Sequence, residues 1–263
     1  GTNKEDLERA RSLSDSGVDL IVIDTAHGHS AKVLKTLSKI KKINSKISIC
    51  VGNIATGEAA KKLYNSGADI IKVGIGPGSI CTTRMVAGIG VPQISAIMEV
   101  KKALNKKEIK IISDGGIKFS GDIAKAIAAG ADAIMMGSIF AGTDESPGKK
   151  FKINGKSFKQ YRGMGSIGAM SSGSANRYFQ KNYKDKSKFV PEGVEGRVEY
   201  KGSVSKIIYQ LQGGLRSSMG YIGAKNLNEL KRKAKFIKIT KAGFYESMVH
   251  SVEMTQKTIN YKL

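Results

Sequence analysis

The sequence predicts an α/β fold built from successive βα units of a (β/α)8 TIM barrel, of which we expect the later five. Three near repeats, at residues 16–19, 66–69 and 129–132, have the form Ser/Ala-Gly-Val/Ala-Asp, and each stands between a helical pattern and a strand. The strands are apolar with little alternation, which is typical of parallel strands covered on both faces. Glycine and polar residues follow each strand, at the end where barrels carry their chemistry.

Five strands are expected along the chain: Leu20–Asp24, Ile47–Val51, Ile70–Val73, Ile109–Ser113 and Ala133–Met136. The glycine of each near repeat suits a left-handed helix C-cap, so a short linker leads directly into the next strand. A doubly wound sheet would gather functional residues at one switch point. Here all five strand ends carry them, which favours the barrel. Because a barrel closes with eight strands, roughly three opening units are expected to lie outside this sequence.

The segments between the strands have the apolar spacing of amphipathic helices, one of which begins near Pro92. The regular pattern ends after residue 140. Residues 143–202 are polar and glycine-rich with weak periodicity, which predicts a mobile functional flap. Helical patterns return near residues 204–212 and 227–235.

The composition limits the class of protein. A chain of 263 residues can bury one large core, and no run approaches the 18 apolar residues of a membrane span. Its two cysteines form no disulfide framework, which predicts a reducing, cytoplasmic setting. The net charge of +22 suggests nucleic acid as one possible partner. The lysines, however, are spread over helix faces and loops, so a solvated surface explains the charge better.

The segment from Gly74 to Arg84, with the sequence GIGPGSICTTR, is the most informative one. Its glycines and proline force an irregular backbone around Cys81, which a buried structural cysteine does not need. We therefore predict that Cys81 is a nucleophile, with nearby backbone N–H groups favouring its thiolate. The alternative is an ordinary core cysteine. Cys50 lies inside an apolar strand and is predicted to be such an inert residue.

Several motifs resemble the inosine-5′-monophosphate (IMP) dehydrogenase family. They are Asp24 to Ser30, Val51 to Asn53, Gly74 to Arg84, Ser113 to Gly116, Met135 to Ser138, Tyr161 to Gly165 and Asn176 to Phe179. On this resemblance, residues 1–263 correspond to the later units, flap and tail of the family's catalytic TIM-barrel domain. The active-site loop is then at about 74–91 and the mobile flap at about 143–202, and the regulatory CBS domains have no counterpart. Part of the family's substrate pocket comes from the missing units, so the printed sequence is not expected to be active alone.

The resemblance implies NAD-dependent oxidation of IMP to XMP, the committed step of guanine nucleotide synthesis. Cys81 would add to C2 of the purine, hydride would leave to the nicotinamide, and water would hydrolyse the thioimidate (E-XMP). Two pairs would activate this water: Arg177 with Tyr178, and Thr83 with Glu192. Arginine holds its proton up to a pKa above about 12, so burial and the tyrosine would have to favour a neutral guanidine. The alternative for Arg177 is a surface residue on a loop.

The resemblance also implies the ligand contacts. The residues expected to bind IMP are Ser79, Asp114, Gly116, Gly137, Ser138, Tyr161, Gly163, Met164, Gly165 and Glu192. Those expected to bind NAD are Asp24, His27, Asn53, Gly74 and Gly76. Backbone carbonyls expected to hold K⁺ belong to Gly76, Gly78 and Cys81, with Glu246, Ser247 and Met248 donated by a neighbouring subunit of a homotetramer. Turn glycines and a helix-capping Asp114 are the alternatives from the residues alone.

Two other functions stay open. Guanosine-5′-monophosphate (GMP) reductase, which deaminates GMP to IMP with NADPH, has almost the same cysteine loop but needs no hydrolytic flap. Three features favour the dehydrogenase: Tyr161 to Gly165, Asn176 to Phe179, and the pair Gly137-Ser138. A non-catalytic barrel that binds nucleic acid would use the positive charge, but it would leave Cys81 and the flap unexplained. We therefore expect IMP and NAD as partners, and neither a membrane nor nucleic acid.

Overall fold

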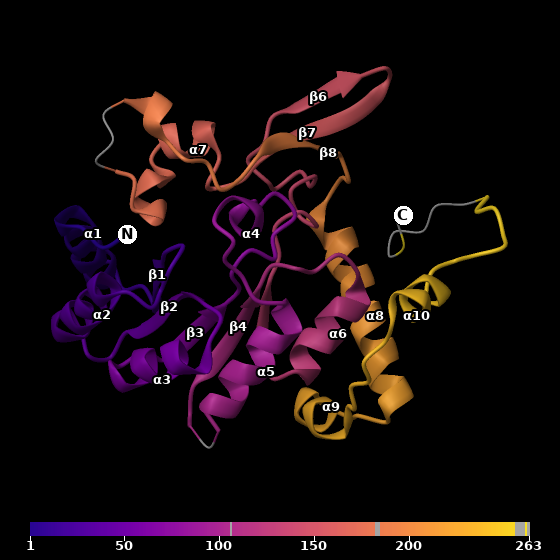
Figure 1. Cartoon of the computed structure of the whole chain (residues 1–263), viewed down its shortest axis with the longest axis horizontal. Coiled ribbons are helices and arrows are strands. Elements are labelled where there is room, and N and C mark those ends of the chain that lie inside the picture. The colour runs from indigo at the N-terminus through magenta and orange to yellow at the C-terminus, as the bar shows by residue number, and fades with distance from the viewer. Residues whose placement is uncertain (106, 182–184, 256–260, 262–263) are drawn as a thin grey trace.

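The computed structural model describes residues 1–263 except 106, 182–184, 256–260 and 262–263 (Figure 1). Five parallel strands form one sheet in chain order: β1 (Leu20–Asp24), β2 (Ser48–Ile54), β3 (Ile70–Val73), β4 (Lys110–Asp114) and β5 (Ala133–Met135). The helices along this part of the chain are α1 (Lys4–Asp15), α2 (Ala31–Ile43), α3 (Gly57–Asn65), α4 (Thr83–Val86), α5 (Gln93–Ala103) and α6 (Ser120–Ala128). The five predicted strands are thus confirmed, and β2 continues beyond its predicted end.

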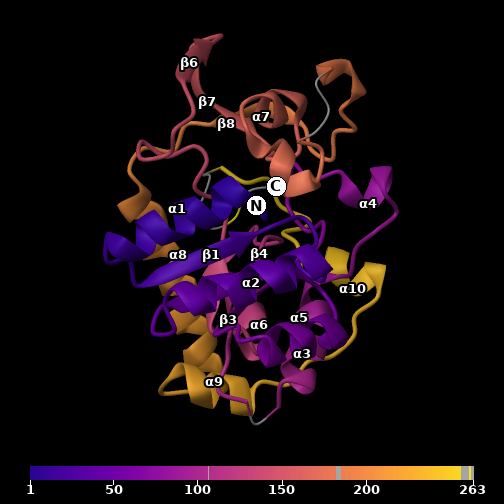
Figure 2. The same cartoon turned by 90° about the vertical axis from the view of Figure 1, so that its left-hand side faces the viewer.

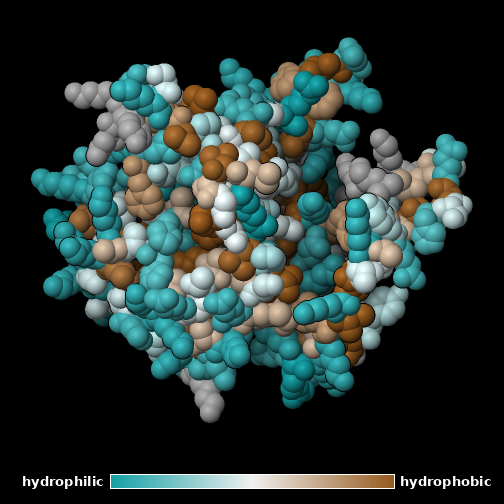
Figure 3. All heavy atoms as spheres, in the orientation of Figure 1, coloured by the Kyte–Doolittle hydropathy of each residue, from teal (hydrophilic) through white to brown (hydrophobic). Residues whose placement is uncertain are grey.

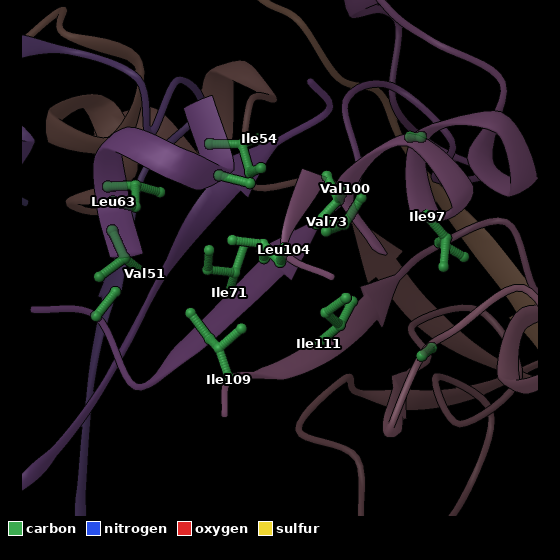
Figure 4. Close-up of a cluster of buried hydrophobic side chains, with 14 of the residues drawn as sticks. Val51, Ile54, Leu63, Ile71, Val73, Ile97, Val100, Leu104, Ile109 and Ile111 are labelled. Atoms are coloured by element: carbon green, nitrogen blue, oxygen red, sulfur yellow. The ribbon is translucent and has the colours of Figure 1, made fainter. Parts of the chain in front are cut away.

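The core lies between the sheet and its helices. The parallel register places Ile23 beside Val51, Val51 beside Ile71, and Ile71 beside Ile111, so β-branched side chains form a continuous row. Figure 4 shows this row meeting Leu63 of α3 and the apolar side chains of α5. Replacing a buried isoleucine of such a row with alanine costs about 2–5 kcal/mol.

The strands differ in how far they are covered. The central strands β2 and β3 are buried on both faces, as the sequence predicts. The outer strands β1 and β5 are not, since more exposed and less exposed side chains alternate along each of them. Leu20, Val22 and Met135 therefore remain exposed on the face turned away from the helices.

The near repeats have two structural roles. Their glycines Gly17, Gly67 and Gly130 follow helix ends with φ angles of +77°, +97° and +125°, which confirms the predicted left-handed caps. Their aspartates tie strands together. Asp69 accepts the N–H of Ile49 and the ammonium of a lysine, both at 2.7 Å, and Asp132 accepts the N–H of Ile111 at 2.9 Å.

The flap is more regular than the sequence predicts. It contains an antiparallel sheet of β6 (Lys150–Ile153), β7 (Lys156–Arg162) and β8 (Glu195–Glu199), with α7 (Ile167–Ser171) and the 3₁₀ turns η1 (Ser174–Tyr178) and η2 (Lys186–Lys188) between β7 and β8. Figures 1 and 2 show it beyond one end of the parallel sheet. The turn between β6 and β7 is Asn154-Gly155, both with positive φ, a strong hairpin signal that our sequence analysis did not use.

The chain after the flap packs back onto the barrel units. Helix α8 (Val204–Ile222) lies against α6 with Ile207 and Leu211 buried, and α9 (Leu227–Lys233) contacts both. A last helix, α10 (Lys241–Glu246), follows. Among the described residues, no helix is both long and apolar enough to cross a membrane. Hydrophilic side chains cover most of the face in Figure 3, with a group of apolar ones near its centre.

Candidate active site

The ends of the parallel strands open into a cavity of about 400 Å³. Asn53 of β2, Gly74 after β3, Asp114 of β4 and Gly137 after β5 all line it, together with the cysteine loop and the flap. The carboxyl ends of parallel strands meet at one edge, so residues distant in sequence come together there. A larger hollow of about 660 Å³ between α1 and α2 is lined mainly by charged and apolar helix side chains and no strand end. Volume alone therefore does not locate the site.

Cys81 lies in this cavity at the start of a hydrogen-bonded chain. Its Sγ is 3.2 Å from Thr83 Oγ1, which donates to Glu192 Oε2 at 2.7 Å. Because the threonine hydroxyl has one hydrogen, it accepts from the Cys81 thiol while it donates to the carboxylate. The structure thus joins three predicted catalytic residues from the loop and the flap.

Backbone contacts fix the cysteine loop at both its ends. Arg84 donates to the carbonyls of Ile75, at 3.2 Å, and Val91, at 2.5 Å, and so closes the neck of the loop. The N–H of Thr82 donates to the carbonyl of Glu192 at 3.0 Å, which attaches the loop to the flap. These backbone contacts therefore fix the Cys81 thiol and the Glu192 carboxylate relative to each other.

Arg177 and Tyr178, the other predicted water-activating pair, reach the same cavity from η1. Arg177 forms an ion pair with Asp24, and its carbonyl accepts the N–H of Ala26 at 3.0 Å. Burial works to lower the pKa of Arg177, but the Asp24 carboxylate outweighs burial and raises it. Burial raises the pKa of Tyr178, against the opposing effect of Arg177. Asp24 and Tyr178 thus both favour the charged guanidinium in this arrangement. The transient neutral guanidine that the hydrolytic role requires stays a prediction.

Lys72 is a buried cation that the sequence analysis missed. Its side chain is 3% exposed, and its ammonium lies 3.0 Å from Asp24 Oδ1 and contacts Asp114 Oδ2. Asn53 Nδ2 donates to the same Asp114 oxygen at 3.0 Å. Burial works to raise the pKa of Asp24, but Arg177 and Lys72 outweigh it and lower it. The signal was present in the sequence, because a lysine inside an apolar central strand needs carboxylate partners.

An adjoining cavity of about 150 Å³ brings together Ser79, Gly116, Gly137, Ser138 and Tyr161, the residues of the predicted phosphate cradle. Tyr161 shares a hydrogen bond with Ser79, and burial raises the pKa of its phenol. A Cβ at Gly137 would lie 2.7 Å from the Tyr161 hydroxyl, so a larger residue there would have to displace the end of the tyrosine side chain. Lys118 also lines this cavity and adds a cation that the sequence analysis did not single out.

The residues predicted to bind the cofactor are divided by the structure. Asn53, Gly74 and Gly76 line the 400 Å³ cavity at the strand ends. Gly163, Met164 and Gly165, from the predicted IMP set, line the same cavity. Asp24 adjoins it through Arg177. His27 is exposed, with its ring 6.3 Å from that of His29, and does not line the cavity; the neighbouring Ala26 does.

Two observations bear on the predicted cofactor and the predicted cation. Asn53 Oδ1 is buried and has no hydrogen-bond partner in the described part of the chain, so it suits a carboxamide donor such as that of a nicotinamide. Gly76, Gly78 and Cys81 lie in one loop and offer neutral carbonyl oxygens, the donor type that suits K⁺. Glu246, Ser247 and Met248 lie at the end of α10, which Figure 1 shows well apart from α4 within this chain.

A family model described as "IMP dehydrogenase / GMP reductase domain" matches residues 1–250. The chain belongs to the IMP dehydrogenase/GMP reductase family. It is 56% identical over 262 residues to the inosine-5′-monophosphate dehydrogenase of Aquifex aeolicus, covering 99% of this chain and 53% of that relative. It is 55% identical over 257 residues to that of Cryptosporidium parvum, covering 97% and 64%. The chain thus spans about half the length of the curated relatives it matches.

A solved member of this family has the same fold. The GMP reductase of Trypanosoma brucei, in complex with guanosine 5′-monophosphate, matches with a TM-score of 0.88 and 45% identity over 96% of this chain and 52% of that one. Family membership and the α/β barrel fold predicted from the sequence are therefore both confirmed.

Proposed function

We propose that this protein oxidises IMP to XMP with NAD as hydride acceptor, through a covalent adduct on Cys81. The observation that carries the proposal is the chain from Cys81 through Thr83 to Glu192, which shares one cavity with Arg177 and Tyr178. A nucleophilic thiol accounts for adduct formation, and groups that activate water account for its hydrolysis. The family members named inosine-5′-monophosphate dehydrogenase support the same activity.

In the first half-reaction, the Cys81 thiolate forms a C–S bond to C2 of the purine. The thiol proton passes to Thr83 as the threonine proton passes to Glu192, along the observed hydrogen bonds. Bound NAD would supply the acceptor for the hydride that leaves C2. Asn53 would hold its carboxamide and Asp24 its nearer ribose, while the cradle around Ser79 and Gly137 binds the substrate phosphate.

In the second half-reaction, water attacks C2 of the thioimidate and loses a proton to the protein, and the C–S bond breaks to return the Cys81 thiolate. Arg177 Nε is buried without a hydrogen-bond partner among the described residues, so its N–H can orient this water. A guanidinium accepts no proton. Arg177 can therefore take a proton from this water only after losing one of its own to solvent, a loss that the ion pair with Asp24 opposes. Once Glu192 has released to solvent the proton it took from Cys81, the Thr83–Glu192 pair offers a second route for the proton of this water.

Asp24 would serve both half-reactions in turn. Arg177 pairs with Asp24 Oδ2 and Lys72 lies 3.0 Å from Oδ1, so with the flap in this position each oxygen that the ribose hydroxyls would use already has a cationic partner. We therefore propose that the cofactor leaves before the flap takes the position seen here. The two steps share one site, so the enzyme separates them in time.

We further propose a cytoplasmic homotetramer with cyclic fourfold symmetry. Glu246, Ser247 and Met248 of one subunit would complete the K⁺ site begun by Gly76, Gly78 and Cys81 of the next, a heterologous contact that closes as a ring. Bound K⁺ would order the backbone of the cysteine loop. Its proposed ligands are all oxygen atoms of the main chain.

GMP reduction is the second candidate, and the match to the Trypanosoma brucei enzyme favours it. One experiment separates the two. The full-length protein is given IMP with NAD⁺, or GMP with NADPH, without oxygen, and the reduced cofactor is followed by absorbance. We expect NADH formation that depends on IMP and K⁺. Consumption of NADPH with GMP, and no NADH with IMP, would overturn the proposal.

A further inference from the structure

We propose that Asp6 of α1 is a positioning residue of the flap: it holds Asn176 and thereby places the adjacent Arg177 in the active site. Asn176 Nδ2 donates to Asp6 Oδ2 at 2.9 Å, and Asn3 Nδ2 donates to Asn176 Oδ1 at 3.1 Å. These side chains are half-buried. Figures 1 and 2 both place the flap segment that follows α7 against the start of α1.

The Asp6 carboxylate is also held by its own helix. Its Oδ2 also accepts the N–H of Asn3 at 2.8 Å, which forms the capping box of α1. Burial works to raise the pKa of Asp6, but the hydrogen bonds from Asn3 and Asn176 help to outweigh it and lower the pKa. The helix thus presents an oriented anion to the flap.

The turn η1 is held on two sides. Asn176 contacts α1, while the next residue contacts the end of β1 through the Arg177–Asp24 ion pair and the hydrogen bond from Ala26 to the Arg177 carbonyl. On the proposed function, on which this inference rests, the cofactor competes with Arg177 for Asp24. The Asp6–Asn176 contact lies outside that competition and biases the flap toward closure whenever Asp24 is free.

A more exposed ion pair accompanies this contact. Lys181, just beyond η1, lies 3.2 Å from Glu5 on the same turn of α1. Exposed pairs of this kind contribute little on their own. Hydrogen bonds to a charged group contribute more, so we assign the bias to Asp6.

The first test needs no turnover. Hydrogen exchange of the amides of residues 174–181 is measured in Asn176→Ala, Asp6→Ala, the double variant, and Glu8→Gln as control. Glu8 lies on the same helix, is 64% exposed, and pairs only loosely with Lys4, at 3.9 Å. We expect exchange about tenfold faster in the first two variants, no further increase in the double variant, and no change in the control.

The second test is kinetic. Asn176→Ala should lower the KM for NAD, because the cofactor meets a less closed flap, and should slow XMP release after a normal burst of NADH. Asn176→Asp should lower the KM for NAD and slow XMP release more strongly, because its carboxylate repels that of Asp6. Combining Asp6→Asn with Asn176→Asp should restore both the KM and the release rate.

The two proposals fail in different ways. Unchanged exchange in residues 174–181, or a swapped pair that rescues nothing, would overturn the role of Asp6. Absence of NADH formation in the unaltered protein would overturn the proposed function, while the exchange measurement would still decide the contact.

Discussion

Lys72 and Asp24 form an ion pair across an intervening strand, and a glycine makes this possible. The register aligns Asp24 of β1 with Gly52 of β2, and Gly52 with Lys72 of β3. A Cβ at Gly52 would lie 2.7 Å from both the Cβ and the carbonyl oxygen of Lys72. Because Gly52 has no side chain, the Lys72 ammonium can cross β2 and lie 3.0 Å from Asp24 Oδ1.

Lys72→Met should leave the carboxylates of Asp24 and Asp114 without their shared cation. Both carboxylates are partly exposed and keep the partners Arg177 and Asn53, so the free energy of unfolding should fall by about 1–3 kcal/mol, the cost of losing a hydrogen-bond partner of a charged group. On the proposed function the KM values for IMP and NAD should both rise. Lys72→Arg keeps the charge and should recover part of each loss. Lys46→Met, on an exposed turn, is the control. Equal behaviour of Lys72→Met and the control in denaturant titrations would contradict the role of Lys72.

Gly52→Ala should destabilise the protein by about 1–3 kcal/mol, because the new methyl group meets main-chain and Cβ atoms that cannot move aside. Gly213→Ala is the matched control, since a Cβ there meets nothing within 4 Å and the site is helical. Helix propensity predicts a gain of about 0.5–1 kcal/mol for the control. Thermal unfolding of both variants measures the difference. If Gly52→Ala were as stable as the wild type, β2 would be able to move away from Lys72 without cost, and the steric role of Gly52 would be contradicted.

The two cysteines should differ sharply in reactivity. Cys50 is fully buried, and burial raises its pKa to about 11, whereas Cys81 is partly exposed beside Thr83. Brief treatment with iodoacetamide at neutral pH should therefore modify Cys81 alone. Peptide mass spectrometry locates the adduct. Cys81→Ser should take up no label, and Cys81→Ala should form no NADH. Equal labelling of both thiols would argue against a distinct environment for Cys81.

Asp132→Asn should lower the free energy of unfolding by about 1–2 kcal/mol at neutral pH, because the carboxylate accepts from Ile111 N–H and from Lys231 at 2.6 Å. Burial works to raise its pKa, but these partners outweigh burial and lower it. The stabilisation is therefore complete above the unfolded pKa of about 3.9 and is lost as pH falls through the lower folded value. Acid titrations of the variant and of the exposed control Glu108→Gln test this. A difference that persists in strong acid would contradict it.

The fold was predictable because each βα unit has its own local sequence pattern. The near-repeat glycines and the apolar strands locate each βα unit, and the residues around Cys81 mark it as the candidate nucleophile. Lys72 and Gly52 were not predicted. A lysine inside an apolar strand was a local signal that was overlooked, but the identity of its partners and the role of Gly52 depend on the register between strands. The ion pair of Arg177 with Asp24 was missed for the same reason. The hairpin at Asn154-Gly155 is different, because its signal was local and was overlooked within a polar segment.

Arg177→Ala should separate the two half-reactions. Its side chain contacts Asp24 and shares the cavity with Tyr178, but the chain from Cys81 to Glu192 does not include it. Hydride transfer should therefore proceed, and hydrolysis should slow by about 10²–10⁴-fold, the usual contribution of a general acid or base. We expect a burst of NADH near one equivalent per site, followed by slow turnover while the thioimidate accumulates on Cys81. Tyr178→Phe should behave in the same way but more mildly.

The pH response identifies what replaces the lost side chain. Raising the pH should partly restore hydrolysis in Arg177→Ala, because hydroxide or the Thr83–Glu192 pair can take over. Adding Glu192→Gln should remove the second of these routes and flatten the response. Rapid quenching and mass analysis of the protein measure the fraction of Cys81 that carries the adduct. If Cys81 stayed unmodified during turnover of Arg177→Ala, the guanidinium would have no part in hydrolysis, and its ion pair with Asp24 would serve only to hold the flap.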